Sequence, residues 1–206
     1  LMAALERTGR RQNTLVCFLS DNGGPTESNA SRNDPLRGGK GSVWEGGFRV
    51  PFVMSWPGRL PAGLRVDAPV IGHDLSVTAL ALAGLDVASD RKLDGADLMP
   101  FLTGQTAIPP HESLFWRMGG GKAWAVRQGR WKLVQTGPDR TPALYDLAAD
   151  ISETHDLAAE QPELVTRLRK AWETWNADNL PPAFPGYREY HERKNAFYDE
   201  LLGATG

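Results

Sequence analysis

The first clear pattern along the chain is a short apolar run that ends abruptly in polar residues. Leu15–Leu19 are bulky or apolar, and Ser20–Asn22 and two glycines follow at once. The run is too short for a membrane span and predicts a buried strand. Residues 1–9 before it have helical spacing and stop at Gly9, which predicts the end of a helix. A helix followed by a strand favours an α/β fold with a parallel sheet.

The rest of the first half predicts one more strand and two helices. Residues 23–34 are polar without periodicity and predict a surface loop or rim. The run PFVMSW at 51–56 predicts a second buried strand that ends at a Pro-Gly pair. Asp74 predicts an N-cap for a helix over 75–83, with Leu75, Ala79 and Leu82 on its buried face. A short helix is expected over 97–102.

The second half has the periodicity of a small antiparallel sheet. Residues 114–118 predict a strand, and 124–127 and 131–135 alternate around Gln128-Gly129, as in a hairpin. Residues 143–145 predict a further strand. Residues 162–177 give the clearest helix, which should cover one face of this sheet. Its apolar stripe consists of Leu164, Val165, Leu168, Trp172 and Trp175.

The end of the chain and its division into domains are read from composition. Residues from Pro181 onward mix aromatic and charged side chains, which predicts an extension that packs on a neighbouring surface. A second copy of the chain, as in a homo-oligomer, is one candidate for that surface. The proline pair after Ile108 marks the expected boundary, with one domain over 1–108 and another over 109–206.

Net charge and cysteine content exclude some classes of partner and cross-link. The 206 residues carry a formal net charge of −2, which gives no electrostatic case for binding nucleic acid or an anionic membrane. No apolar run approaches the roughly 20 residues of a membrane helix. With one cysteine, Cys17, the chain has no internal disulfide, and we expect this side chain to be a small buried hydrophobe.

Two polar segments carry the candidate chemistry. Asp21 and Asn22 follow a predicted strand, where open α/β sheets bind ligands, and their oxygens suit a hard cation such as Ca²⁺ or Mg²⁺. Lys40 lies in GGKGS, where glycines allow a close approach to an anion. A nucleotide P-loop would need Gly at Asp34 and Ser or Thr at Gly41, so that pattern fails twice. Alone, Asp-Asn-Gly is also a common turn.

Other polar residues have simpler interpretations. Glu45 and Arg49 bracket two glycines and predict a structural salt bridge or loop anchor. Arg37 could reach a substrate anion, but a solvated arginine is the default expectation. None of the four histidines has metal-ligand spacing to another. His73, beside Asp74, is interpreted as part of a helix cap.

The motifs together resemble a known family. SDNGG, PLRGGKGSVWEGGFRVPF and WPG resemble the second half of a type I sulfatase of the alkaline phosphatase superfamily, and the resemblance continues more weakly through WKL and LYDL. It implies the C-terminal part of a sulfatase-like α/β sandwich, followed by a small antiparallel sheet packed on a C-terminal helix. It also implies that Asp21 and Asn22 ligate Ca²⁺, with Mg²⁺ or Mn²⁺ less favoured. Lys40 would bind the sulfate group and serve as a catalytic residue.

The family's nucleophile is missing from this sequence. A sulfatase forms a formylglycine in a C/S-X-P-X-R motif, and Cys17 is followed by neither the proline nor the arginine. We therefore expect a truncated C-terminal portion, inactive alone, whose partners are the N-terminal part of the enzyme and a sulfated small molecule or saccharide. The alternatives are a phosphomonoester or phosphonate hydrolase of the same superfamily, or a non-catalytic binding module. Periplasmic, secreted and cytoplasmic locations all remain open.

Overall fold

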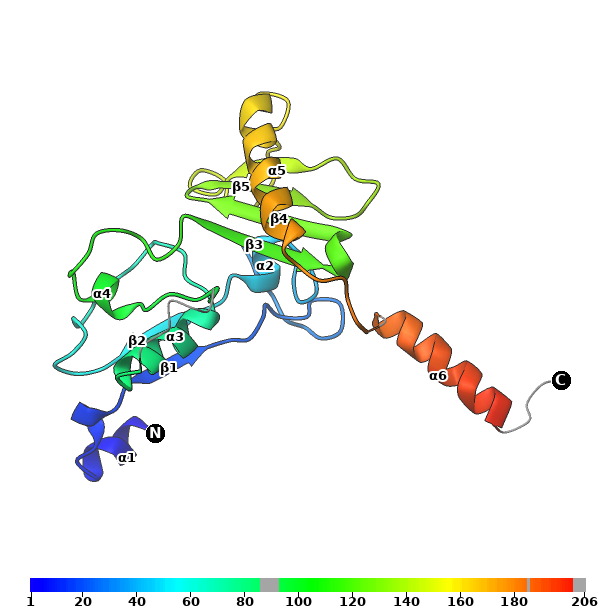
Figure 1. Ribbon diagram of the computed structural model, residues 1–206. Coiled ribbons are helices and arrows are strands. Elements are labelled where there is room, and N and C mark those ends of the chain that lie inside the picture. Colours follow the sequence, from blue (N-terminus) through cyan, green and yellow to red (C-terminus); the bar gives the residue numbers. More distant parts are fainter. Residues whose placement is uncertain (86–92, 185, 202–206) are drawn as a thin grey trace.

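Two antiparallel sheets organise the computed structural model, which describes residues 1–85, 93–184 and 186–201 (Figure 1). The helices are α1 (Met2–Arg7), α2 (Glu45–Phe48), α3 (His73–Leu82), α4 (Met99–Leu102), α5 (Pro162–Ala177) and α6 (Tyr187–Leu201), with short 3₁₀ helices at Arg11–Asn13 and Gly119–Gly121. The strands are β1 (Val16–Leu19), β2 (Phe52–Ser55), β3 (Ser113–Met118), β4 (Ala123–Gln128), β5 (Trp131–Gln135) and β6 (Ala143–Asp146). None of the described helices is both long and apolar enough to cross a bilayer.

The second half forms a four-stranded sheet in the order β3-β4-β5-β6, with each strand antiparallel to the next. Alternate side chains point to opposite faces, so Trp124 and Val126 join one core cluster and Ala125 joins the other. Helix α5 covers the first face, and α2 with its flanking loop lies against the second (Figure 1). The predicted strands, the hairpin and the covering helix are confirmed.

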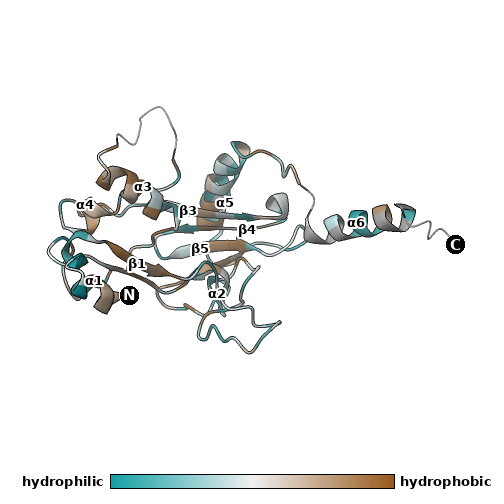
Figure 2. Ribbon diagram, turned by 90° about the horizontal axis from the view of Figure 1, so that it is seen from below, coloured by the Kyte–Doolittle hydropathy of each residue, from teal (hydrophilic) through white to brown (hydrophobic). Residues whose placement is uncertain are grey.

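Helix α5 holds the sheet through large side chains. Leu168 is fully buried, and the Trp172 ring stacks on the Trp124 ring with centroids 4.5 Å apart. Trp175 stacks on Phe115 at 5.1 Å. Figure 2 shows apolar segments within the four-stranded sheet, whose two faces are both covered. The sheet is therefore a well-packed support for whatever lies on its second face.

The first half differs from the prediction in strand direction. Strand β1 pairs antiparallel with β2, from Val16 opposite Ser55 to Leu19 opposite Phe52, so the expected parallel pairing is wrong. A parallel pair needs a crossover connection, usually a long helix. Residues 20–51 contain only the single turn of α2, and the chain returns beside β1. The strands are also less buried than predicted, because Phe18 and Val53 are 67% and 58% exposed.

Helix α3 also departs from the predicted cap and face. It begins at His73 after an N-cap at Gly72, so Asp74 lies in its first turn. Its buried side chains are Asp74, Val77 and Thr78, whereas Ala79 and Leu82 are exposed. The polar residues are buried because Asp74 and Thr78 accept hydrogen bonds from the backbone of Ala96 and Leu98. Helix α4 confirms the short helix expected over 97–102, although it begins two residues later, at Met99.

The C-terminal extension is helical, which its composition did not predict. Helix α6 projects away from the four-stranded sheet in Figure 1. The expectation that residues 181–206 pack on another surface stays a prediction, and residues 185 and 202–206 of that stretch lie outside the described residues. The expected boundary near residue 108 falls between α4 and β3 and also stays a prediction.

Candidate functional site

The turn after β1 carries the two predicted metal ligands. Asp21 is exposed and Asn22 is half-buried. The backbone N–H of Asn22 donates to Asp21 Oδ1 at 3.0 Å, and Ser20 Oγ donates to the Asn22 carbonyl at 2.9 Å. Asn22 Nδ2 donates to the Gly23 carbonyl at 2.9 Å. Because its nitrogen is engaged, the Asn22 Oδ1 is the amide atom available to accept a hydrogen bond or to ligate a cation.

Lys40 lies in a tight turn of the glycine-rich loop. Ser42 closes the turn, because its hydroxyl donates to the Gly39 carbonyl at 2.8 Å and its backbone N–H donates to the same oxygen at 3.0 Å. Gly39 is buried, whereas Lys40 is exposed. The backbone of the loop is thus anchored, and the exposed Lys40 side chain carries a compact positive charge.

Backbone hydrogen bonds bring these two segments together. The Gly23 N–H donates to the Gly47 carbonyl at 3.0 Å, and the Lys40 N–H donates to the Gly24 carbonyl at 3.3 Å. The approach is so close that a Cβ on Gly23 would lie 1.7 Å from the Gly46 carbonyl oxygen. The turn that carries Asp21 and the loop that carries Lys40 therefore share one glycine junction, although they are 15 or more residues apart in sequence.

Asn33 fastens the same junction from the polar loop. Its Oδ1 accepts the Gly24 N–H at 2.9 Å, and its Nδ2 donates to the carbonyls of Gly24 and Gly38, both at 3.0 Å. One amide side chain therefore spans both segments. The aperiodic polar pattern of residues 23–34 predicts a surface loop or rim and gives no indication of this role for Asn33. An asparagine in a glycine-rich, aperiodic loop is a weak signal for such a role.

Asp21 and Asn22 have the oxygen donor atoms that a hard cation prefers, but they supply only part of the number of ligands that it takes. Asp21 supplies a carboxylate with acceptor capacity beyond its one N–H contact, and Asn22 supplies an amide oxygen. Ca²⁺ takes about six to eight oxygen ligands. Across residues 1–85, 93–184 and 186–201, no group of three or more His, Cys, Asp or Glu side chains is placed to hold a metal ion.

A second group of charges lies behind the glycine loop. Glu45 is fully buried and its Oε2 is 3.4 Å from Arg49, which confirms the predicted salt bridge. Its Oε1 accepts a hydrogen bond from Lys132 Nζ at 3.0 Å, and Lys132 Nζ also lies 2.6 Å from Glu153 Oε1. Burial raises the pKa of Glu153 above its ordinary value, and the nearby Lys132 opposes that shift. Neither Lys132 nor Glu153 lies in a sequence motif that predicts this contact.

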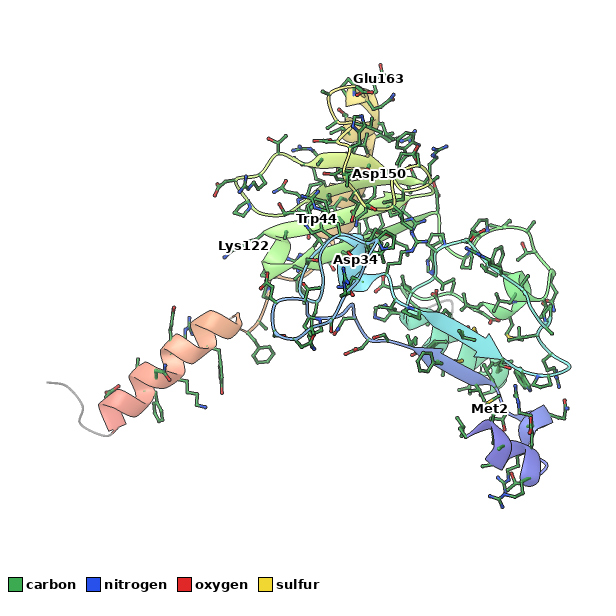
Figure 3. The ribbon with its side chains drawn as sticks, turned by 180° about the vertical axis from the view of Figure 1, so that it is seen from behind. Met2, Asp34, Trp44, Lys122, Asp150 and Glu163 are labelled. Carbon is green, nitrogen blue, oxygen red and sulfur yellow. The ribbon has the colours of Figure 1, made fainter. Side chains whose placement is uncertain are left out.

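Arg37 is exposed, as expected for a solvated arginine, but its guanidinium group also has protein partners. Its Nη1 donates to the Glu153 carbonyl at 2.8 Å, and its guanidinium carbon lies 3.8 Å from the ring centroid of Trp44. Figure 3 shows Trp44 against the four-stranded sheet and Asp34 in the loop beside it. A cavity of about 630 Å³ opens here. Its lining includes Thr26, Asp34, Arg37, Gly38, Glu153 and Thr154.

The remaining titratable candidates are structural. His111 Nε2 lies 2.8 Å and 3.0 Å from the two carboxylate oxygens of buried Asp74, which joins α3 to the segment before β3. His73 is exposed at the start of α3. Cys17 is half-buried, and burial raises the pKa of its thiol, so the thiolate form is disfavoured.

Comparison with known proteins relates the chain to sulfatases. The family model described as Sulfatase matches residues 1–85. Steryl-sulfatase of Rattus norvegicus is 41% identical over 197 residues, covering 78% of this chain and 34% of that protein. Arylsulfatase D of Homo sapiens is 32% identical over 201 residues, covering 80% of this chain and 34% of that protein. The chain spans about a third of the length of these relatives.

Solved structures show the same fold. The structure of Ps i-CgsB in complex with k-i-k-neocarrahexaose matches with a TM-score of 0.81 at 34% identity, covering 95% of this chain and 44% of that chain. The phosphonate monoester hydrolase of Agrobacterium radiobacter matches with a TM-score of 0.65 at 26% identity, covering 86% and 38%. The expected α/β fold with its small antiparallel sheet on a C-terminal helix is confirmed. On these matches the chain belongs to the sulfatase family, within the alkaline phosphatase superfamily.

Proposed function

We propose that this chain supplies the metal-binding and sulfate-binding loops of a Ca²⁺-dependent sulfatase that hydrolyses sulfate esters. The supporting observation is the glycine junction, which joins the Asp21-Asn22 turn to the Lys40 loop by backbone hydrogen bonds. A cation held by one segment and an ammonium on the other can then act on the same tetrahedral oxyanion. The relatives named above are sulfatases, which favours a sulfate over another anion.

Each residue has a distinct task in this proposal. Asp21 and Asn22 hold part of the cation's shell, and a bound Ca²⁺ supplies Lewis acidity and positive charge toward the ester oxygens. Lys40 places its ammonium beside a non-bridging oxygen, where negative charge develops as the ester bond breaks. The nucleophile, a formylglycine by family resemblance, and the remaining metal ligands come from residues outside this sequence.

The substrate class proposed is a sulfated small molecule or saccharide. One relative is named a steryl-sulfatase, and one structural neighbour is described in complex with a neocarrahexaose. A sterol and an oligosaccharide are both bulky, so under this proposal a sulfate ester of either kind would have to bring its sulfate group to the Lys40 loop. The polar loop over residues 25–37 lies next to that loop, which supports a role for its side chains in contacting the alcohol part of a substrate.

Replacing Lys40 tests the proposal directly. In the complete enzyme, Lys40→Ala should lower kcat on an aryl sulfate by roughly 10²–10³, the usual effect of removing one oxyanion-stabilising group. Lys122→Ala is the matched control, because Lys122 is also exposed but lies at the edge of the four-stranded sheet (Figure 3). Equal kinetics for Lys40→Ala and wild type would remove Lys40 from the reaction.

Three further measurements address the metal and the nucleophile. Chelation of Ca²⁺ should abolish turnover in the complete enzyme, and Asp21→Ala should raise the Ca²⁺ concentration needed for half-maximal activity. The purified 206-residue chain should hydrolyse no aryl sulfate, because it lacks the nucleophile and part of the metal shell. Sulfatase activity in that pure chain would contradict the proposed division of the site.

A phosphonate or phosphomonoester hydrolase is the second candidate function. It is favoured by the structural match to a phosphonate monoester hydrolase. Sulfate and phosphate esters have similar tetrahedral shape, but the phosphate carries more negative charge and calls for a more cationic site. The ratio of kcat/KM for an aryl sulfate to that for an aryl phosphate or phosphonate decides between them, and a ratio below one would favour the second candidate.

A further inference from the structure

A buried ion cluster lies between the Lys40 loop and the four-stranded sheet. We call Glu45, Lys132 and Glu153 the Lys132 cluster; all three are fully buried. Lys132 Nζ lies 3.0 Å from Glu45 Oε1 and 2.6 Å from Glu153 Oε1, so one ammonium bridges two carboxylates. Figure 1 places α2, which begins at Glu45, directly against the sheet that carries Lys132. The cluster therefore joins two parts of the chain that are far apart in sequence.

The charges around the cluster are compensated. Arg49 and Arg127 lie 3.4 Å and 3.7 Å from Glu45 Oε2, so three cations surround two carboxylates. Burial lowers the pKa of Arg127, while Glu45 favours its charged form. A buried charge without a partner is strongly unfavourable, so each member depends on the others. Replacing Lys132 by a neutral side chain leaves both carboxylates short of their bridging partner.

Glu153 holds the Lys40 loop at both ends. Its Oε2 accepts the Glu45 backbone N–H at 2.8 Å, and its carbonyl accepts a hydrogen bond from Arg37 Nη1, also at 2.8 Å. The Gly46 N–H in turn donates to the Arg37 carbonyl at 2.8 Å and closes the loop. Lys40 lies between these two anchor points. Glu153 itself has a φ of 52°, a conformation that non-glycine residues rarely adopt, so its surroundings fix it there.

We propose that Lys132 and Glu153 are positioning residues for Lys40: the ion cluster fixes both ends of residues 37–45 and so sets where the Lys40 ammonium lies. This rests on the proposed function only for the identity of the anion that Lys40 meets. The effect is indirect, because neither residue belongs to the turn or the loop that would contact substrate. The geometry requires that loss of the cluster loosen this loop while the face of the sheet under α5 stays packed.

Hydrogen exchange of the 206-residue chain tests the loop separately from any activity. In Lys132→Met, exchange of backbone amides in residues 38–47 should rise on the order of tenfold or more, while amides of β4 and α5 change far less. Arg130→Ala is the matched control, since Arg130 lies two residues earlier and its ion pair with Asp146 does not reach the loop. If Lys132→Met does not fold, Glu153→Asp, which keeps the charge but shortens the reach, should give the same local pattern. Unchanged or uniformly raised exchange would overturn the proposal.

A double-variant cycle in the complete enzyme separates positioning from general destabilisation. Lys132→Met should lower kcat on an aryl sulfate by on the order of tenfold or more, but should have little further effect when Lys40 is already alanine. Equal losses in both backgrounds would mean that Lys132 does not act through Lys40. A wild-type enzyme inactive on sulfate esters would contradict the proposed function, and the exchange experiment would still decide the positioning role.

Discussion

Gly23→Ala should destabilise the protein, because the structure leaves no room for the added Cβ. The added Cβ would lie 1.7 Å from the Gly46 carbonyl oxygen and 2.8 Å from its carbon, whereas ordinary contacts begin near 3.4 Å. Both neighbours are backbone atoms, so no side chain can rotate away. The two segments must separate by about 1.7 Å, which is far more than the hydrogen bond from the Gly23 N–H to Gly47 can absorb.

The size of the effect follows from three terms. Overpacking of a close backbone contact costs about 1–3 kcal/mol, and the lost hydrogen bond costs about 0.5–1.5 kcal/mol. Reduced freedom of the unfolded chain returns roughly 0.4–1 kcal/mol. We therefore expect Gly23→Ala to lower the free energy of unfolding by about 2 kcal/mol, within a range of about 0.5–4 kcal/mol. A displacement of roughly 1 Å also costs about 10²-fold in rate, so turnover of the complete enzyme should fall at least that far.

Urea unfolding of the 206-residue chain, followed by tryptophan fluorescence, measures the stability term. Gly72→Ala is the control: Gly72 has a φ of −58°, and no atom lies within 4 Å of an added Cβ. That variant should stay within about 1 kcal/mol of wild type, because the loss of a preferred N-cap residue opposes the reduced freedom of the unfolded chain. If Gly23→Ala were equally well tolerated, the close junction between the Asp21 turn and the Lys40 loop would not exist in solution.

Three other substitutions test the fold. Trp172→Ala should lower the free energy of unfolding by about 3–5 kcal/mol in urea, because it empties a buried site; a loss below 1 kcal/mol would contradict the packing of α5. Asp74→Ala should lower the free energy of unfolding by roughly 2–4 kcal/mol, because it leaves His111 and two backbone N–H groups without their acceptor. Almost no loss, as at an exposed position of a helix, would contradict this role of Asp74. The Arg130 guanidinium, hydrogen-bonded to Asp146, holds the pKa of that carboxyl below its usual value. The pair therefore stabilises the fold at neutral pH and is lost as the pH falls through the lowered pKa. Arg130→Gln should thus lower the urea midpoint at pH 7, with the deficit shrinking toward pH 3; a constant deficit would refute the assignment.

The second half of the chain could be predicted from sequence because its signals are local. Alternation over residues 124–135 set the hairpin, and the stripe of α5 has one apolar side whose residues pack on the sheet. The helix bounds of 162–177 match α5 at both ends. In such segments the periodicity, the turn residues and the buried face all agree, so little is left for long-range contacts to decide.

Prediction failed where tertiary contacts override the local pattern. The apolar run at β1 does not reveal whether its partner strand is parallel, since that depends on how residues 20–51 return to it. On α3, leucines suggested the buried face, yet the structure buries Asp74 and Thr78, whose side chains accept backbone N–H groups from residues 96 and 98. A polar residue with a distant partner has the same sequence signature as a solvated one.

For the same reason, only some residues of the candidate site can be predicted from the sequence. Asp21 and Asn22 could be singled out because their oxygen-bearing side chains follow a predicted strand, and Lys40 because it lies in a glycine-rich loop. The residues that hold those loops cannot be recognised in this way: Glu153 is more than 100 residues from both Arg37 and Glu45. Lys132 looks like an ordinary polar position on an alternating strand, yet both faces of that strand are covered. A lysine there must find a carboxylate partner, because burial without one is too unfavourable to persist. A charged residue in a strand with two buried faces therefore predicts a buried partner of opposite charge. Here those partners belong to the segments that hold the Lys40 loop.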